Sequence, residues 1–264
     1  MIHRRAGASR LPSVCRHFPR VVVTDPRGAS ITLSHFCPTA ADLLFAGTPL
    51  AIVEAPPSLA LDGEVEGLDA TAVLPPLLSQ GVLTDWEGYS AWEEAAVALF
   101  NDAEAEPEQA VGSLERATDL ACGWRPGREP LAAAMRRAFA ASTIRGSTRI
   151  STIRGPTRIS TIRGSTRITT IRGFHTDLQR SGDIPDRGNR DQWNGLGRVA
   201  NAFLAAHAFA SWAAYDRDGL RAIAAAVRRA LTLLTKNASA REPLTREGLI
   251  EAIRDTDLAL RHRS

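Results

Sequence analysis

The residues best suited to chemistry lie near the N-terminus of the chain. Two of the three cysteines are there, and three histidines accompany them: Cys15, Cys37, His3, His17 and His35. Thiolates and imidazoles are ligands that zinc and iron–sulfur clusters take from proteins. A closed zinc site needs about four of them, and this stretch offers two thiols. Cysteine is also a residue that is often buried, so two structural cysteines are the alternative interpretation.

The elements around these cysteines favour bringing them together. The β-rich runs 21–24 and 31–33 flank Asp25-Pro26-Arg27-Gly28, a sequence typical of a tight turn. Pro38 directly follows Cys37 and fits the first turn of a helix that ends near Gly47. A hairpin places its two ends side by side, and a helix N-terminus favours a thiolate. The pattern therefore predicts that Cys15 and Cys37 lie near each other.

Most of the remaining chain is expected to be helical. Residues 48–83 are rich in proline and predict a surface connection with one short helix. Ser90 and Glu93 have the spacing of a capping box that opens a helix through about Asp102. Further helices are expected over 107–122 and from Pro130 to about 141. Cys122 closes the first of these in an apolar context, which favours a core position.

The C-terminal part continues this pattern. A helix is expected over 196–215, and its uncharged run 199–215 is better explained by burial than by a membrane span, because alanine dominates it. The next helix carries a clean apolar stripe at three- and four-residue spacing: Leu220, Ile223, Val227, Leu231 and Leu234. A final helix is expected over about 245–260. The fold class predicted is mainly α, a helical bundle with a small N-terminal β-hairpin.

A nonapeptide repeat of the type STIRGSTRI occupies residues 142–173. On a helix its isoleucines share no face, and as a meander of strands they alternate between faces beside arginine. We expect a flexible basic insert. The division of the chain is then a partial cysteine motif with hairpin (1–47), a helical region (48–141), the repeat (142–173) and a C-terminal helical region (174–264) that packs with 84–141 as one domain.

The charge distribution narrows the classes of partner. The net charge is +3, but the repeat contains seven arginines and no acid, so the rest of the chain is net negative. Binding to nucleic acid is therefore expected only of the repeat, and it lacks the aromatic residues that stack on bases. Three cysteines without a signal-peptide pattern favour a reducing cytoplasm and no membrane association. The oligomeric state is left open.

Three pieces of the N-terminal stretch together resemble a known pattern. They are Ile2-His3, Cys15-Arg16-His17-Phe18-Pro19 and Ser34-His35-Phe36-Cys37-Pro38. The pattern is that of the YkgJ-like cysteine-cluster family of zinc- or iron-chelating proteins, to which flagellin lysine N-methylase is related. In outline the family has C-x-x-C-x-x-C-C, G-x-C-x-I-H, C-R-x-F-P and S-x-x-C-P. The resemblance covers about the first 45 residues of this chain.

The resemblance implies a metal centre whose other cysteines precede Ile2, so we expect a family member that lacks its N-terminal part. Its full-length form would bind an iron–sulfur cluster or zinc through Cys15, Cys37 and upstream thiols, with His3 as a further ligand. Methylation of lysine in a protein substrate is the implied activity, and no residue is assigned to catalysis or to a cofactor other than the metal. The alternative is a non-catalytic helical interaction protein with a basic repeat arm, and no metal in this chain.

Overall fold

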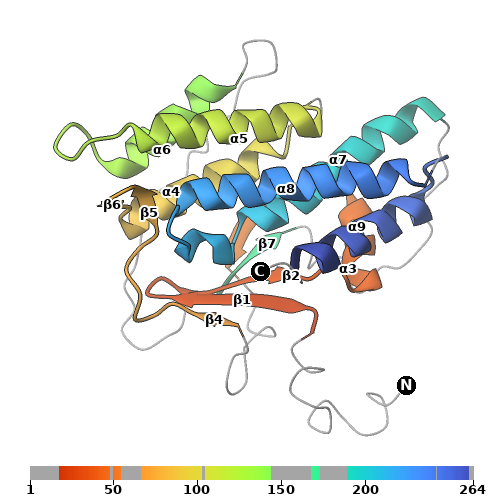
Figure 1. Cartoon of the computed structure of the whole chain (residues 1–264), viewed down its shortest axis with the longest axis horizontal. Helices are drawn as coiled ribbons and strands as arrows, with labels where there is room; N and C mark the ends of the chain where they lie inside the picture. The colour runs from red at the N-terminus through yellow and green to blue at the C-terminus, as the bar shows by residue number, and fades with distance from the viewer. Residues whose placement is uncertain are drawn as a thin grey trace, which may run out of the picture.

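The computed structural model of the chain describes residues 18–47, 50–54, 67–102, 105–143, 168–172, 189–241 and 243–261. Helices form most of this structure, and a small sheet lies beneath them in the view of Figure 1. The predicted fold class, mainly α with an N-terminal hairpin, is confirmed.

The N-terminal hairpin has the predicted form. Strand β1 (Arg20–Asp25) pairs antiparallel with β2 (Gly28–Leu33), and Asp25 lies opposite Gly28 across a two-residue turn. Gly28 has a φ of 127°, a conformation that glycine adopts without strain. One face of the hairpin is buried through Val23, which belongs to the main core.

The sheet contains one strand from the repeat. Its order is β3-β7-β2-β1-β4, with β3 at Ala51–Glu54, β4 at Leu68–Asp69 and β7 at Ile168–Arg172. Strand β7 is parallel to β2 and antiparallel to β3, so both of its edges are paired. The expectation of a flexible insert is therefore wrong for these five residues. The other residues of the repeat from 144 onward lie outside the described part of the chain.

The region before the bundle also differs from expectation. In place of a short helix, the described residues of 48–83 form strands, with β5 (Leu77–Ser79) paired to β6 (Val82–Leu83) in a separate small sheet. Strand β5 touches the bundle closely, because a Cβ on Gly219 would lie 1.9 Å from the carbonyl oxygen of Leu77. Gly219 also has a positive φ of 53°, so this contact requires glycine.

Helix α4 (Trp86–Leu99) begins earlier than the capping-box pattern predicts. Its N-cap is Asp85, whose Oδ1 accepts a hydrogen bond from the backbone N–H of Gly88 at 2.5 Å. Aspartate caps a helix as well as serine does, and Ser90 therefore lies inside the first turns of the helix. The box at Ser90 and Glu93 is a chance match, and both side chains have another role, described below.

The remaining helices are α3 (Pro38–Leu43) with the 3₁₀ turn η2 (Leu44–Ala46), α5 (Pro107–Cys122), α6 (Leu131–Ser142), α7 (Asn189–Ala208), the 3₁₀ turn η4 (Trp212–Tyr215), α8 (Leu220–Ser239) and α9 (Arg246–Arg261). The single helix expected over 196–215 is thus divided. Ala210, with a φ of 50°, turns the chain between α7 and η4. Its N–H donates to Glu93 Oε1 of α4 at 3.1 Å, so the tertiary contact holds the chain out of the helix.

A single large core lies between these helices and the hairpin. The predicted stripe of α8 is buried throughout, as are the large side chains of Tyr89, Trp92 and Phe203. The same core includes Val23 of β1 and Ala41 of α3. Alanines fill much of the remaining space, which lets the helix axes approach closely.

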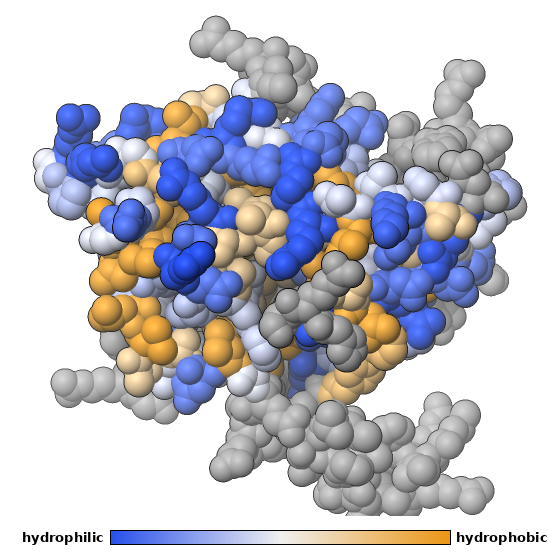
Figure 2. Space-filling model, viewed as in Figure 1, coloured by the Kyte–Doolittle hydropathy of each residue, from blue (hydrophilic) through white to orange (hydrophobic). Residues whose placement is uncertain are grey.

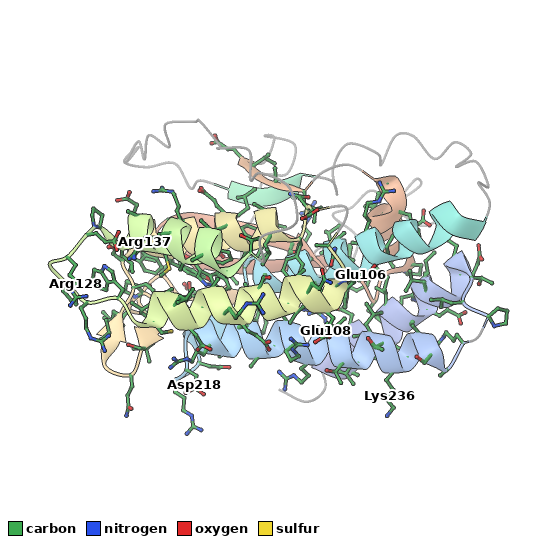
Figure 3. The ribbon with its side chains drawn as sticks, turned by 90° about the horizontal axis from the view of Figure 1, so that it is seen from above. Glu106, Glu108, Arg128, Arg137, Asp218 and Lys236 are labelled. Atoms are coloured by element: carbon green, nitrogen blue, oxygen red, sulfur yellow. The ribbon has the colours of Figure 1, made fainter. Side chains whose placement is uncertain are left out.

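Helices α5 and α8 lie side by side, and their outer edges are joined by charge. Arg228 of α8 donates to both carboxylate oxygens of Glu115 on α5, at 2.9 and 2.7 Å, and also to Glu108. Glu108 lies on α5 where that helix runs beside α8 (Figure 3). Hydrophilic side chains cover much of the face seen in Figure 1, with apolar groups gathered toward its lower left and lower right (Figure 2).

The turn of the hairpin is fixed to the bundle by a buried ionic network. Arg27 Nη2 lies 2.7 Å from Asp25 Oδ2, and Arg27 Nη1 lies 2.7 Å from Glu93 Oε2 and 3.0 Å from Ser90 Oγ. The guanidinium stacks over the ring of Tyr89, 4.3 Å from its centroid. The hairpin is therefore held at its turn by α4, and its open end is left to position the cysteine motif.

Candidate functional site

The open end of the hairpin brings the two halves of the cysteine motif together. Ser34 N donates a hydrogen bond to Pro19 O at 2.6 Å, just beyond the last strand pair, Arg20 with Leu33. Pro19 ends C-R-H-F-P, and Ser34 begins S-H-F-C-P. The predicted ligands Cys15 and His3, together with His17, lie outside the described residues. For the part that is described, the predicted juxtaposition of the two motif segments is confirmed.

Cys37 occupies the end of this segment, directly before α3. Its N–H donates to Ser34 O at 3.3 Å, and its carbonyl accepts from Ala41 N at 3.0 Å. Its backbone is extended, and Pro38 begins the helix as predicted. The thiol is free and half-buried, so it lies at the surface of the fold and not in its core.

The segment that leads to Cys37 is anchored from below by a buried carboxylate. Asp257 of α9 accepts hydrogen bonds from Ser34 Oγ at 2.7 Å and from Phe36 N at 3.0 Å. Arg261 Nε donates to the same carboxylate at 3.2 Å. Asp257 is only 1% exposed. Burial alone would raise its pKa, but His207, Arg261 and the other polar neighbours outweigh burial, so the pKa of Asp257 is lowered.

Two imidazoles complete this cluster. His35 and His207 pack edge-on against the ring of Phe203, with ring centroids 5.4 and 4.6 Å apart. His207 Nε2 lies 3.6 Å from Asp257 Oδ1. Burial lowers the pKa of His35 to about 3 and also lowers the pKa of His207. Both rings are therefore neutral at pH 7, and the only charge they face is the carboxylate with its Arg261 partner.

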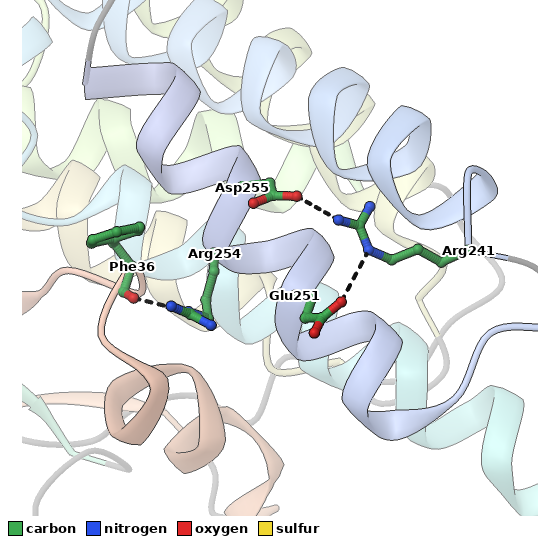
Figure 4. A pocket seen from close by; sticks show the side chains of 5 residues that line it. All are labelled: Phe36, Arg241, Glu251, Arg254 and Asp255. Atoms are coloured by element: carbon green, nitrogen blue, oxygen red, sulfur yellow. Dashed lines mark hydrogen bonds and ion pairs between the residues drawn. The ribbon is translucent and has the colours of Figure 1, made fainter.

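Phe36 is held from its solvent side as well. Arg254 Nε donates to Phe36 O at 3.1 Å, and its guanidinium lies 5.6 Å from the Phe36 ring. These two residues line an open hollow of about 220 Å³ with Arg241, Glu251 and Asp255 (Figure 4). Arg241 is engaged by both acids, so the charges of the hollow are largely balanced within it. Its effect is to fix the residue before Cys37 on both sides.

The third cysteine belongs to the core, as the sequence suggests. The Sγ of Cys122 donates to Leu78 O at 2.7 Å, and burial raises the pKa of this thiol. Within the residues that the structure describes, no three side chains of histidine, cysteine, aspartate or glutamate are grouped so that they could hold a metal ion. Cys37 is thus the one predicted metal ligand whose surroundings are described, and it is accessible.

Sequence reasoning did not find Asp257, Arg254 or Arg261, the residues that position the motif from α9. They lie more than 200 residues from it along the chain, and no local pattern connects the two segments. The only available signal was the polar Asp257 among the apolar residues of the final helix.

Membrane insertion finds no candidate either: among the described helices, none is both long and apolar enough to reach across a bilayer. Comparison with known proteins adds no relative. No protein-family model matches the chain, and no curated protein or solved structure matches it.

Proposed function

We propose that this chain carries the closing half of a cysteine-cluster metal centre, in which Cys15 and Cys37 bind zinc or an iron–sulfur cluster. The observation that carries the proposal is the hydrogen bond from Ser34 N to Pro19 O, because it joins the two cysteine-bearing segments at one end of the hairpin. Cys15 is three residues from Phe18, and a chain of three residues spans at most about 11 Å. Both thiols therefore belong to the same end of the molecule.

The build of this end supports a ligand role for Cys37. A metal site needs ligands held by hydrogen bonds from a second layer of residues. The Cys37 segment has such support: Asp257 and Arg254 bind the polar groups on either side of His35 and Phe36, while the thiol itself stays accessible. A cysteine kept only for packing would resemble Cys122, whose sulfur is buried and hydrogen-bonded.

Two thiols are fewer than the four ligands of a closed zinc or iron–sulfur site. The family pattern assigns the remaining ligands to cysteines that precede Ile2, and His3 is the nearest further candidate in this sequence. Methylation of a protein lysine is part of the same proposal through the family resemblance, as is a cytoplasmic location. No described residue is assigned to that reaction.

The test compares three serine variants that differ only in the cysteine replaced: Cys15→Ser, Cys37→Ser and Cys122→Ser. The protein is purified without oxygen and offered zinc alone, or ferrous iron with sulfide. We expect wild type and Cys122→Ser to retain metal, and the other two variants to lose at least tenfold in affinity. Metal analysis and the visible absorbance of the cluster provide the measurement.

The metal-to-chain ratio adds a second result. One metal or cluster per chain requires further ligands from the same polypeptide, whereas one per two chains means that two copies each supply two thiols. A wild-type protein that binds no metal, with folding intact, would favour the alternative of a non-catalytic helical interaction protein. Equal binding by Cys37→Ser and Cys122→Ser would refute the assignment of Cys37.

A further inference from the structure

The slot between β2 and β3 is filled by a strand from the repeat. In the parallel pairing with β2, Ile168, Thr169 and Thr170 lie opposite Ala29, Ser30 and Ile31. In the antiparallel pairing with β3, residues 169–172 lie opposite residues 51–54. Thr170 is central, because it is paired on both sides. A strand in this position is held by backbone hydrogen bonds along both edges, and these do not depend on the identity of its side chains.

The chain contains this strand three times. Residues 150–154 and 159–163 both read Ile-Ser-Thr-Ile-Arg, and β7 reads Ile-Thr-Thr-Ile-Arg. The copies differ only by the methyl group that Thr169 has and Ser151 and Ser160 lack. Threonine favours a strand slightly more than serine, so the slot distinguishes the copies weakly.

The connections on either side allow an exchange of copies. When β7 fills the slot, roughly 24 residues join it to α6 and roughly 16 join it to α7. With 159–163 in the slot, these lengths become roughly 15 and roughly 25. The entropy of closing a loop grows only with the logarithm of its length, so one loop loses about what the other gains. Register in a sheet is well defined only where the competing strands differ.

We propose that the slot between β2 and β3 is a binding site for the five-residue strand Ile-Ser/Thr-Thr-Ile-Arg, and that residues 159–163 of the same chain exchange with β7 in it. The partner of this surface is thus another copy of the repeat. A displacement by nine residues preserves every pairing of the ladder, whereas any other displacement places glycine, proline or a different residue in it. The repeat length is therefore the step of the exchange.

Three proline variants test this in the full chain. Proline lacks an N–H and is tolerated only at sheet edges, so Thr170→Pro removes β7 from a slot that is paired on both sides. The double variant Thr152→Pro/Thr161→Pro disables the other copies and leaves β7 intact. The triple variant disables all three. Hydrogen exchange of segments 28–33 and 51–54 reports whether the slot is filled, and thermal unfolding reports the stability.

We expect the single and double variants to unfold within about 4 °C of wild type and to keep the protection of both segments. The triple variant should unfold at least twice that far below wild type, with exchange in both segments at least tenfold faster. Thr170→Pro behaving like the triple variant would overturn the exchange, and so would a triple variant as stable as wild type. A dimeric Thr170→Pro protein would overturn it too, because the strand would then come from a second chain.

Discussion

Replacing Arg27 by methionine should destabilise the fold more than any exposed arginine would. The change keeps the length of the side chain and removes the guanidinium that lies between the carboxylates of Asp25 and Glu93, whose side chains are only 1% and 3% exposed. Burial lowers the pKa of Arg27, but the two carboxylates raise it further, so the residue is charged throughout the accessible pH range. The variant leaves two buried negative charges without their counterion.

The magnitude follows from what the two carboxylates retain. Removing one partner of a buried ion pair costs about 3–5 kcal/mol. Asp25 keeps hydrogen bonds from the backbone N–H of residue 27 at 2.8 Å and from Tyr215 Oη at 3.1 Å, and Glu93 keeps the bond from Ala210 N. These bonds favour the lower end, about 3 kcal/mol. For a chain of this size the thermal midpoint should then fall by about 6–12 °C.

The assay is urea unfolding followed by circular dichroism, with Arg137→Met as the matched control. Arg137 is paired with Glu129, but its side chain is 70% exposed, and surface pairs contribute about 0–1 kcal/mol. Adding Glu93→Gln to the Arg27 variant removes one of the two unpaired charges and should recover part of the loss. Equal midpoints for Arg27→Met and Arg137→Met, at equal slope, would refute the account of the buried network.

Two further predictions concern the cluster below Cys37. Asp257→Ala leaves Ser34 Oγ and Phe36 N without their acceptor and should cost about 2–4 kcal/mol in urea unfolding, whereas Asp255→Ala on the exposed side of α9 should cost less than about 1 kcal/mol; equal costs would contradict the anchoring role. The lowered pKa values of His35 and His207 mean that the unfolded chain binds more protons below pH 6.5, so stability is complete above that pH and falls as the pH decreases, by about 2 kcal/mol for His35 between pH 6.5 and 5. Urea midpoints measured at pH 7 and pH 5 check this, and equal midpoints would show that the imidazoles are not held neutral.

The features that the sequence predicts well are those whose cause is local. The hairpin follows from a turn sequence between two β-rich runs, and the stripe of α8 follows from the spacing of its leucines, isoleucine and valine. Pro38 and Pro107 mark the starts of α3 and α5 as expected. At each of these places, the backbone preference and the side-chain pattern favour the same structure.

The features that it misses depend on partners far away in the chain. Strand β7 has no apolar face of its own in the sequence, and it is a strand because β2 and β3 pair with both of its edges. The start of α4 was misplaced because two capping patterns compete within a few residues, and the tertiary contacts of Ser90 and Glu93 decide between them. The anchor of the cysteine motif was missed for the same reason.

The distance along the chain between Asp257 and Ser34 has a consequence for how the protein is made. They are 223 residues apart, and Asp25 and Tyr215 are 190 apart, so both ends of the hairpin take their fixed positions from segments that leave the ribosome much later. Strand β2 likewise waits for β7. During synthesis the hairpin therefore emerges with an unpaired edge and with Cys37 on an unanchored segment. Such an edge is prone to pair with other chains, and chaperone binding would be most useful in that interval.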